Sequence, residues 1–236
     1  MRSPTTILTG AGSGIGRAAA VLLSRLQHNL VLVGRRLDAL EQTAAICSSL
    51  SLCISADIAE PASAEQIVAS TLKRFGRVDN LINNAGFAPL VEIDKTKPAI
   101  VEEVFQINAL APARLIARSW PHMRTQRSGC IINLSTLGTQ DPFPGFFAYA
   151  SAKSAVNLMA RSCANEGREH NIRAFAIAPG AVDTDMLRGN FPASSVPADV
   201  CLSPESVAQM IVDCLVGLHD ARNGETLFMS KQRGVW

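Results

Sequence analysis

The chain has 236 residues, of which 47% are apolar and 18% are charged. This composition excludes an intrinsically disordered protein, and the length fits one domain over residues 1–236 better than two. Lys and Arg total 22 against 20 for Asp and Glu, and they form no basic run, which argues against nucleic acid or a membrane surface as a partner. The sequence contains neither a secretory segment nor a membrane-spanning apolar run, so we expect a cytoplasmic protein.

Apolar runs alternate with helical stretches along the whole chain. The predicted strands cover residues 5–9, 29–33, 51–55, 80–83, 130–135, 173–178 and 225–229. Helices are predicted between them, near residues 14–26, 37–49, 61–75, 97–125, 148–168 and 203–218. Strands that are apolar almost throughout are typical of a parallel sheet covered on both faces. We therefore predict an α/β fold: a Rossmann-type, doubly wound parallel sheet of about seven strands in the order 3-2-1-4-5-6-7, with helices on both faces.

One long stretch, near residues 184–203, shows neither a helical nor a strand pattern. It contains Gly189, Pro192 and Pro197, which interrupt regular structure. A loop of this length in a compact fold is usually functional, so we interpret it as a substrate loop.

The six cysteines form no C-x-x-C pair, and none of the four histidines stands at ligand spacing from them. Zinc and iron–sulfur sites need such spacing. We therefore expect no bound metal, and reduced thiols of the kind found in cytosolic proteins.

A glycine-rich segment joins the first predicted strand to the first predicted helix. It reads Thr9-Gly10-Ala11-Gly12-Ser13-Gly14-Ile15-Gly16. Glycines let backbone N–H groups approach a phosphate closely, and the start of the following helix adds partial positive charge. This context predicts a turn that binds the pyrophosphate of a dinucleotide. The spacing of Gly10, Gly14 and Gly16 is G-x3-G-x-G, which differs from the general G-x-G-x-x-G fingerprint.

That spacing resembles the cofactor turn of the short-chain dehydrogenase/reductase (SDR) family, T-G-x3-G-I-G. Three later motifs extend the resemblance along the chain: Asn83-Asn84-Ala85-Gly86, Tyr149-x3-Lys153 and Pro179-Gly180-x-Val182-x-Thr184. The resemblance implies a Rossmann fold, a nicotinamide cofactor and an oxidoreductase that acts on a small carbonyl or alcohol substrate. The cofactor contacts that it implies in these motifs are Thr9, Gly10, Gly12, Ser13, Gly14, Ile15, Gly16, Asn84, Ala85, Gly86, Tyr149, Lys153, Pro179, Gly180, Val182 and Thr184.

The end of the second predicted strand indicates which nicotinamide cofactor is preferred. A carboxylate there would bind the adenosine ribose of NAD, but this strand ends in Arg35 and Arg36. Guanidinium groups make charge-assisted bonds to phosphate, which favours NADP(H), with NAD(H) as the alternative cofactor. Both arginines could instead simply begin the next helix in solvent. Asp57 and Ile58 resemble the family's pair at the adenine ring, although Asp57 could equally cap the helix near Pro61.

Tyr149 is the only tyrosine in the chain, and Lys153 follows it by four residues. Residues at i and i+4 share one face of a helix. A cation beside a phenol favours the phenolate, so we expect Lys153 to bring the pKa of Tyr149 down toward neutral pH. The resemblance implies that Tyr149 gives a proton to the substrate carbonyl and that Lys153 also holds the nicotinamide ribose. The alternative is a half-buried aromatic residue beside a surface lysine.

The resemblance also implies a hydroxyl group that orients the carbonyl, thirteen residues before the tyrosine. Counting back from Tyr149 reaches Thr136, whereas Ser135 lies fourteen residues away. We prefer Thr136, with Ser135 as the alternative hydroxyl, because adjacent side chains point to opposite faces of a strand. A β-branched residue without a catalytic role is the remaining interpretation of Thr136.

Asn108 stands where the family carries a catalytic asparagine, whose backbone carbonyl holds a water linked to the lysine. Pro112 has no N–H group. The carbonyl of Asn108, four residues earlier, therefore loses its helical partner and must find another. The alternative is a kinked helix with an ordinary asparagine.

The sequence thus predicts an NADP(H)-dependent oxidoreductase that interconverts a carbonyl and a secondary alcohol. The alternatives are a dehydratase or epimerase on the same scaffold, and a dinucleotide-binding sensor without turnover. Relatives in the family are usually dimers or tetramers, so we expect a homodimer or homotetramer. Bulky side chains suggest an apolar substrate, and the expected pocket rim is Leu90, Phe143, Phe146, Phe147, Met186 and Phe191.

Overall fold

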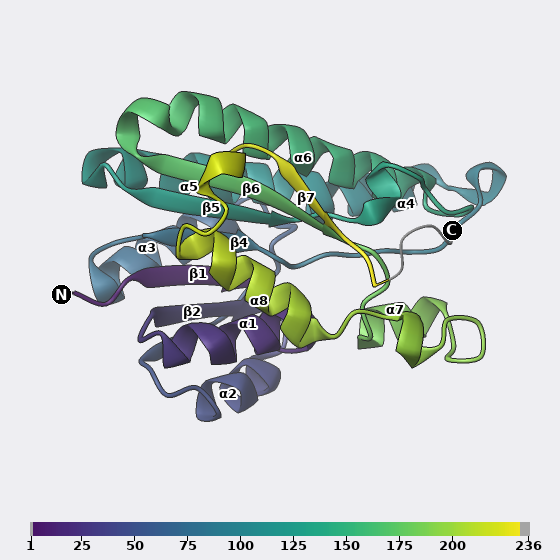
Figure 1. Cartoon of the computed structure of the whole chain (residues 1–236), viewed down its shortest axis with the longest axis horizontal. Coiled ribbons are helices and arrows are strands. Elements are labelled where there is room, and N and C mark those ends of the chain that lie inside the picture. The colour runs from purple at the N-terminus through teal and green to yellow at the C-terminus, as the bar shows by residue number, and fades with distance from the viewer. Residues whose placement is uncertain (1, 232–236) are drawn as a thin grey trace.

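Seven parallel strands form one sheet in the computed structural model, which describes residues 2–231 (Figure 1). The strands are β1 (Thr5–Thr9), β2 (Asn29–Gly34), β3 (Ser51–Ser55), β4 (Asn80–Asn83), β5 (Gly129–Leu134), β6 (Ile172–Pro179) and β7 (Thr226–Met229). Their order across the sheet is β3-β2-β1-β4-β5-β6-β7, which confirms the predicted fold. Because every neighbouring pair is parallel, the carboxyl ends of all the strands meet at one edge of the sheet.

Helices cover both faces of this sheet. They are α1 (Gly14–Arg25), α2 (Leu37–Ala45), α3 (Ser63–Phe75), α4 (Pro98–Phe105), α5 (Ala111–Gln126), α6 (Phe147–Gly167), α7 (Asp185–Asn190) and α8 (Pro204–Leu215). One core packs α1, α2 and α8 against the sheet and contains Leu8, while the opposite core packs α3, α5 and α6 and contains Ile7. Since successive strand residues enter opposite cores, the strands are apolar throughout.

The strand order creates a crevice beside β1. From β1 the chain passes through α1 to β2 on one side, and later it returns to β4 on the other side of β1. The loops that leave the carboxyl ends of β1 and β4 therefore diverge. Open α/β sheets bind ligands in a crevice of this kind.

Two of the predicted segments were wrong in detail. The helix expected over residues 97–125 is divided into α4, a π-helical turn over Gln106–Leu110, and α5. Pro112 lies in the first turn of α5 and supplies no N–H group, so a wider turn before it replaces the regular helical ladder. The stretch expected to be irregular contains α7, and its residue Leu202 forms a parallel bridge with Val182, which precedes the stretch. A helix as short as α7 carries too little periodicity to be recognised in a sequence.

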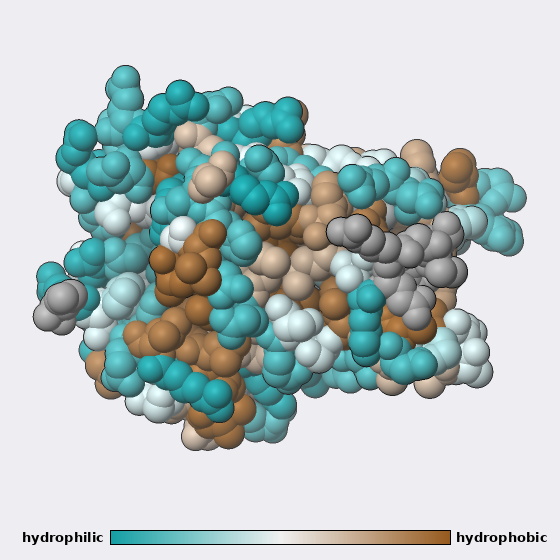
Figure 2. Space-filling model, in the orientation of Figure 1, coloured by the Kyte–Doolittle hydropathy of each residue, from teal (hydrophilic) through white to brown (hydrophobic). Residues whose placement is uncertain are grey.

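Apolar side chains also gather on the surface shown in Figure 2, where α8, α1 and α2 lie one beneath the other. The exposed apolar residues of the chain include Leu26, Ile46 and Val216, which directly follow α1, α2 and α8, together with Leu50 and Leu218. None of these five residues lines the cavity described below. Within residues 2–231, no helix is long and apolar enough to cross a membrane.

The six cysteines are all unpaired, and Cys130, Cys163, Cys201 and Cys214 are buried. Burial raises the pKa of Cys130 and of Cys214 to about 12, because a thiolate loses its hydration there. These thiols are therefore held in the uncharged form, which is the unreactive one. No group of three potential metal ligands occurs in the part of the chain that the structure describes.

Candidate active site

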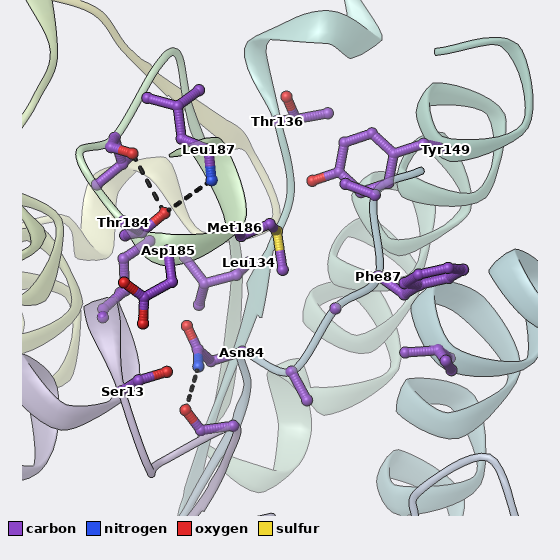
Figure 3. Close-up of a pocket in the computed structure, with 18 of the residues that line it drawn as sticks. Ser13, Asn84, Phe87, Leu134, Thr136, Tyr149, Thr184, Asp185, Met186 and Leu187 are labelled. Atoms are coloured by element: carbon purple, nitrogen blue, oxygen red, sulfur yellow. Dashed lines mark hydrogen bonds between the residues drawn. The ribbon is translucent and has the colours of Figure 1, made fainter. Parts of the chain in front are cut away.

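A cavity of about 520 Å³ lies at the carboxyl ends of the strands. Residues that follow β2 and β3, such as Arg35 and Asp57, line one end of it. Residues that follow β4 and β5, such as Phe87 and Thr136, line the other end, and side chains of α7 such as Met186 also line the cavity (Figure 3). The cavity therefore spans the crevice predicted by the strand order.

The glycine turn after β1 forms one wall of this cavity, and it has no room for a side chain at Gly10 or Gly16. Gly10 has a φ of +67°, and a methyl group there would lie 2.8 Å from the side-chain nitrogen of Asn84. A methyl group at Gly16 would overlap the carbonyl oxygen of Gly10. Ser13 precedes α1 and makes no side-chain cap bond, so the first N–H groups of that helix lie open at the cavity wall. A bare backbone at a helix N-terminus fits the pyrophosphate of a dinucleotide.

Thr9 and Asn84 fasten this turn to the loop after β4. The Asn84 side chain donates to the carbonyl oxygen of Thr9 at 2.9 Å, and the backbone N–H groups of Asn84 and Ala85 each donate to the Thr9 hydroxyl at 3.0 Å. Among the residues expected to touch the cofactor, Thr9 and Gly16 lie behind the cavity wall and do not line it. The Thr9 hydroxyl bonds to the loop after β4, and Gly16 packs closely against the carbonyl of Gly10. Both residues therefore hold the turn in shape.

Arg35 and Arg36 lie at the β2 end of the cavity, and both side chains are exposed. Arg36 immediately precedes α2. The two arginines therefore lie at the start of a helix and also line the cavity, so the two interpretations of the sequence do not exclude each other. Asp57 and Ile58 line the same end. The Asp57 carboxylate accepts from the N–H of Ala59 at 3.0 Å, and α3 begins only at Ser63. Asp57 therefore closes a local turn and does not cap the helix, contrary to one of the two interpretations.

Tyr149 and Lys153 share one face of α6 and both line the cavity. Lys153 is only 3% exposed, and its ammonium group donates to the carbonyl oxygen of Leu134 at 2.7 Å. The same nitrogen lies 6.0 Å from the centre of the Tyr149 ring. The spacing thus brings the two side chains together, as expected from the sequence.

The pKa of Tyr149, however, shifts in the direction opposite to the expected one. Burial raises the pKa of Tyr149 to about 12 and lowers the pKa of Lys153 to about 8. Both shifts have the same cause, because each group loses water that would stabilise its charged form. The prediction that Lys153 lowers the pKa of Tyr149 is therefore wrong for the cofactor-free protein.

The two candidate hydroxyl groups lie at the end of β5 and both line the cavity. The N–H of Ser135 still donates to Ile177 of β6 at 2.7 Å, so strand pairing continues to that residue. The Ser135 hydroxyl is buried and donates to the carbonyl oxygen of Lys153 at 3.4 Å. The Thr136 hydroxyl accepts from the N–H of Gly138 at 3.2 Å, which leaves its own proton available. Figure 3 shows Thr136 at the same end of the cavity as Tyr149.

Asn108 lies within the π-helical turn and is fully buried. Its amide group donates to the carbonyl oxygens of Phe87 at 2.7 Å and Val104 at 2.9 Å, and its side-chain oxygen accepts from the N–H of Phe87 at 3.2 Å. A methyl group at Gly86 would lie 3.1 Å from the Asn108 oxygen and 3.5 Å from the Lys153 nitrogen. The Asn108 side chain thus fixes the loop after β4 against the π-helical turn and the end of α4.

Thr184 and α7 close the cavity from the β6 side. The Thr184 hydroxyl accepts from the N–H of Leu187 at 3.4 Å and donates to the carbonyl of Val182 at 3.2 Å (Figure 3). At the far end of α7, the Asn190 amide donates to the carbonyl of Ala88 at 2.7 Å. The predicted substrate loop is therefore joined across the cavity to the loop that follows β4.

The expected pocket rim was correct in part. Phe143, Phe146, Met186 and Phe191 line the cavity, whereas the predicted rim residues Leu90 and Phe147 do not. Sequence reasoning missed the lining residues Phe87 and Ile107. Their signal was their position, because each adjoins a motif residue that the resemblance had singled out. Among the other cofactor contacts implied by the resemblance, those that line the cavity are Gly10, Gly12, Ser13, Gly14, Ile15, Asn84, Ala85, Gly86, Pro179, Gly180, Val182 and Thr184.

This fold and this cavity together define a dinucleotide-binding oxidoreductase of the Rossmann type. The family model described as short chain dehydrogenase matches residues 4–194. The chain therefore belongs to the short-chain dehydrogenase/reductase family, whose members bind NAD(P)(H).

Individual relatives agree with this assignment. An uncharacterised oxidoreductase of Staphylococcus saprophyticus is 34% identical over 189 residues, which cover 79% of this chain and 77% of the relative. A crystal structure of levodione reductase superposes with a TM-score of 0.91 at 27% identity and covers 98% of this chain and 97% of its own. A 3-ketoacyl-(acyl-carrier-protein) reductase from Brucella melitensis, complexed with NADH, has a TM-score of 0.92 at 23% identity, covers 99% of each chain, and shows the fold alone.

Proposed function

We propose that this protein is an NADP(H)-dependent oxidoreductase that interconverts a carbonyl compound and a secondary alcohol. One observation carries the proposal: Tyr149, Lys153 and Thr136 line the same cavity as the bare glycine turn at the start of α1. A proton donor and a phosphate-binding turn in one cavity are what such a reaction requires.

The glycine turn and the N-terminus of α1 would hold the pyrophosphate, with Thr184 and Lys153 toward the nicotinamide end. A bound nicotinamide supplies or accepts the hydride. The preference for NADP(H) rests on Arg35 and Arg36, which line the β2 end of the cavity with exposed guanidinium groups. A phosphate on the adenosine ribose would find two cations there, where NAD-binding sites carry a carboxylate.

Tyr149 would act as the general acid in carbonyl reduction and as the general base in alcohol oxidation. Its raised pKa of about 12 keeps the phenol protonated at neutral pH, which is the form that donates to a carbonyl oxygen. Thr136 would orient that oxygen, because its hydroxyl proton is available while the Ser135 hydroxyl already donates to the backbone carbonyl of Lys153. After Tyr149 has given up its proton, the Lys153 ammonium group would stabilise the resulting phenolate.

The test is the Tyr149→Phe variant, since it removes the hydroxyl and keeps the ring. The assay follows NADPH consumption with a panel of ketones and aldehydes. We expect turnover to fall about 10²–10⁴-fold, the range typical of a positioned proton donor, while NADPH affinity measured by fluorescence stays near that of the wild type. Near-normal turnover in this variant would remove Tyr149 from the mechanism. A wild-type protein that binds NADPH but turns over no carbonyl compound would instead favour the alternative hypothesis, a dinucleotide-binding sensor without turnover.

The hydroxyl group is assigned by a matched pair of variants in the same assay. Thr136→Ala is expected to lose about 10²-fold in turnover, as when one hydrogen-bond donor to a developing oxyanion is removed. Ser135→Ala should lose much less, because its hydroxyl already donates to the backbone carbonyl of Lys153. The reverse order would reassign the role to Ser135.

A further inference from the structure

The two ends of the cavity differ in charge. Among the described residues that line it, the cations are Arg35, Arg36 and Lys153. The two arginines follow β2, on the side where the adenosine would lie, and the Lys153 ammonium is buried and bonded to a backbone carbonyl. The lining acids, all with exposed carboxylates, are Asp57 on the adenosine side, Asp185 on α7, and Glu103 on α4 and Asp141 after β5 at the opposite end. The substrate end therefore presents negative charge and offers no exposed cation among the residues described.

Three phenylalanines, Phe143, Phe146 and Phe191, line the same cavity as Tyr149. The rings of Phe143 and Phe191 lie 6.1 Å apart, and the Phe146 ring lies 5.2 Å from the Tyr149 ring, edge toward face. Phe191 follows α7 directly, and its ring also lies 6.2 Å from that of Phe146. The hydrogen bond from Asn190 to Ala88 holds this part of the substrate loop in place. A substrate carbonyl that reaches Tyr149 must therefore carry its other groups against phenylalanine rings.

Resting on the proposed function, we propose that the substrate is an uncharged ketone with an aromatic or comparably bulky apolar group. Carbonyl compounds that carry a carboxylate or phosphate are rejected. A carboxylate placed against these rings loses its hydration and meets no exposed cation among the lining residues that the structure describes. The carboxylates of Glu103 and Asp141 repel it further. An uncharged ring instead gains contact area and favourable edge-to-face geometry against the same rings.

The experiment compares 4-acetylbenzamide with 4-acetylbenzoate, which match in size and differ in charge. NADPH consumption gives kcat/KM for each ketone with the wild-type protein. We expect the amide to exceed the carboxylate by about tenfold or more, because an unpaired carboxylate in an apolar site costs more than the 1.4 kcal/mol that a factor of ten represents. Equal values, or a preference for the carboxylate, would overturn the proposal.

Variants separate the effect of charge from the intrinsic reactivity of the two ketones. Asp141→Asn with Glu103→Gln should raise the carboxylate-to-amide ratio several-fold, since it removes the repelling charges. Phe191→Lys should raise the ratio further, because it supplies a cation in the cavity lining. Asp94→Asn is the matched control: this exposed acid lies outside the cavity lining, and the ratio should stay unchanged. A ratio that does not respond to the first two changes counts against the proposal.

Failure of the proposed function gives a different result. If neither ketone is reduced with NADPH or NADH, the proposed reaction is wrong for these carbonyl compounds. Calorimetric binding of the same two compounds to the NADPH-loaded protein, whose nicotinamide ring is uncharged, then decides the charge preference on its own. Tighter binding of the amide supports the inference, and equal or tighter binding of the carboxylate refutes it.

Discussion

Replacing Lys153 by methionine is expected to make the cofactor-free protein more stable while it removes activity. The Lys153 side chain is 3% exposed, and burial lowers its pKa from 10.5 to about 8. At pH 7 this difference corresponds to about 3 kcal/mol of destabilisation, at 1.36 kcal/mol per pKa unit. Loss of the hydrogen bond to the Leu134 carbonyl offsets about 1 kcal/mol of the gain. The Lys153→Met protein should therefore be about 2 kcal/mol more stable at pH 7.

The gain should also depend on pH. Between pH 8 and pH 10.5 the unfolded chain binds a proton at Lys153 that the folded protein lacks, so wild-type stability rises with pH across this window. Below pH 8 both states bind this proton, and the full free-energy cost of burying the Lys153 charge lowers the stability of the folded protein. The advantage of Lys153→Met should consequently shrink by about 1 kcal/mol between pH 7 and pH 9.

Urea denaturation at pH 7 and pH 9, extrapolated linearly to water, measures both quantities. Lys73→Met is the control, because it makes the same substitution at an exposed lysine on α3. NADPH-dependent turnover should be lost in Lys153→Met and kept in the control. A Lys153→Met protein that is less stable than wild type at pH 7, or a gain that does not change with pH, would refute the argument from burial.

Three further predictions concern single features of the site. Because Tyr149 is the only tyrosine, near-ultraviolet absorbance titrates it alone: the folded protein should show no phenolate near pH 10, where the urea-unfolded chain is half ionised, and a native midpoint near 10 would contradict the pKa of about 12. Gly16→Ala places a methyl group on the Gly10 carbonyl, so NADPH binding should be lost in fluorescence titration, and unchanged affinity would show that the turn can relax. Arg35→Ala combined with Arg36→Ala should weaken NADPH binding by about 2–4 kcal/mol and leave NADH nearly unaffected; equal losses for both cofactors would exclude recognition of the ribose phosphate.

The strands could be predicted from the sequence to within one or two residues at each end. Their near-continuous apolar runs reflect burial on both faces, and the glycine turn fixes where β1 ends and α1 begins. The helix expected over residues 97–125 could not be divided correctly, although Pro112 signalled a disturbance. The missing N–H group shows that the helical hydrogen-bond pattern must change near Pro112. It does not show that the change is a π-helical turn over Gln106–Leu110.

The side chains of the site were predictable in identity more than in orientation. The count from Tyr149 favours Thr136. Only the structure shows that strand pairing continues to Ser135 and that the Ser135 hydroxyl donates to the backbone carbonyl of Lys153. Asn108 was expected for its backbone carbonyl, yet its side chain also makes three hydrogen bonds that fix Phe87 and Val104. Contacts between segments far apart in the chain decide these details, and no local pattern encodes them.

The charge state of Tyr149 and Lys153 depends on burial, which their spacing does not reveal. The Lys153 nitrogen bonds to Leu134 and lies 6.0 Å from the centre of the Tyr149 ring, so loss of water outweighs direct attraction at both groups. Both shifts favour uncharged forms, so the phenol of the cofactor-free protein keeps its proton well above neutral pH. A group in this state is ready to give a proton to a carbonyl oxygen, whereas alcohol oxidation requires it to be deprotonated first. If Tyr149 acts as the proposed proton donor, carbonyl reduction should proceed at neutral pH, and the rate of alcohol oxidation should rise with pH.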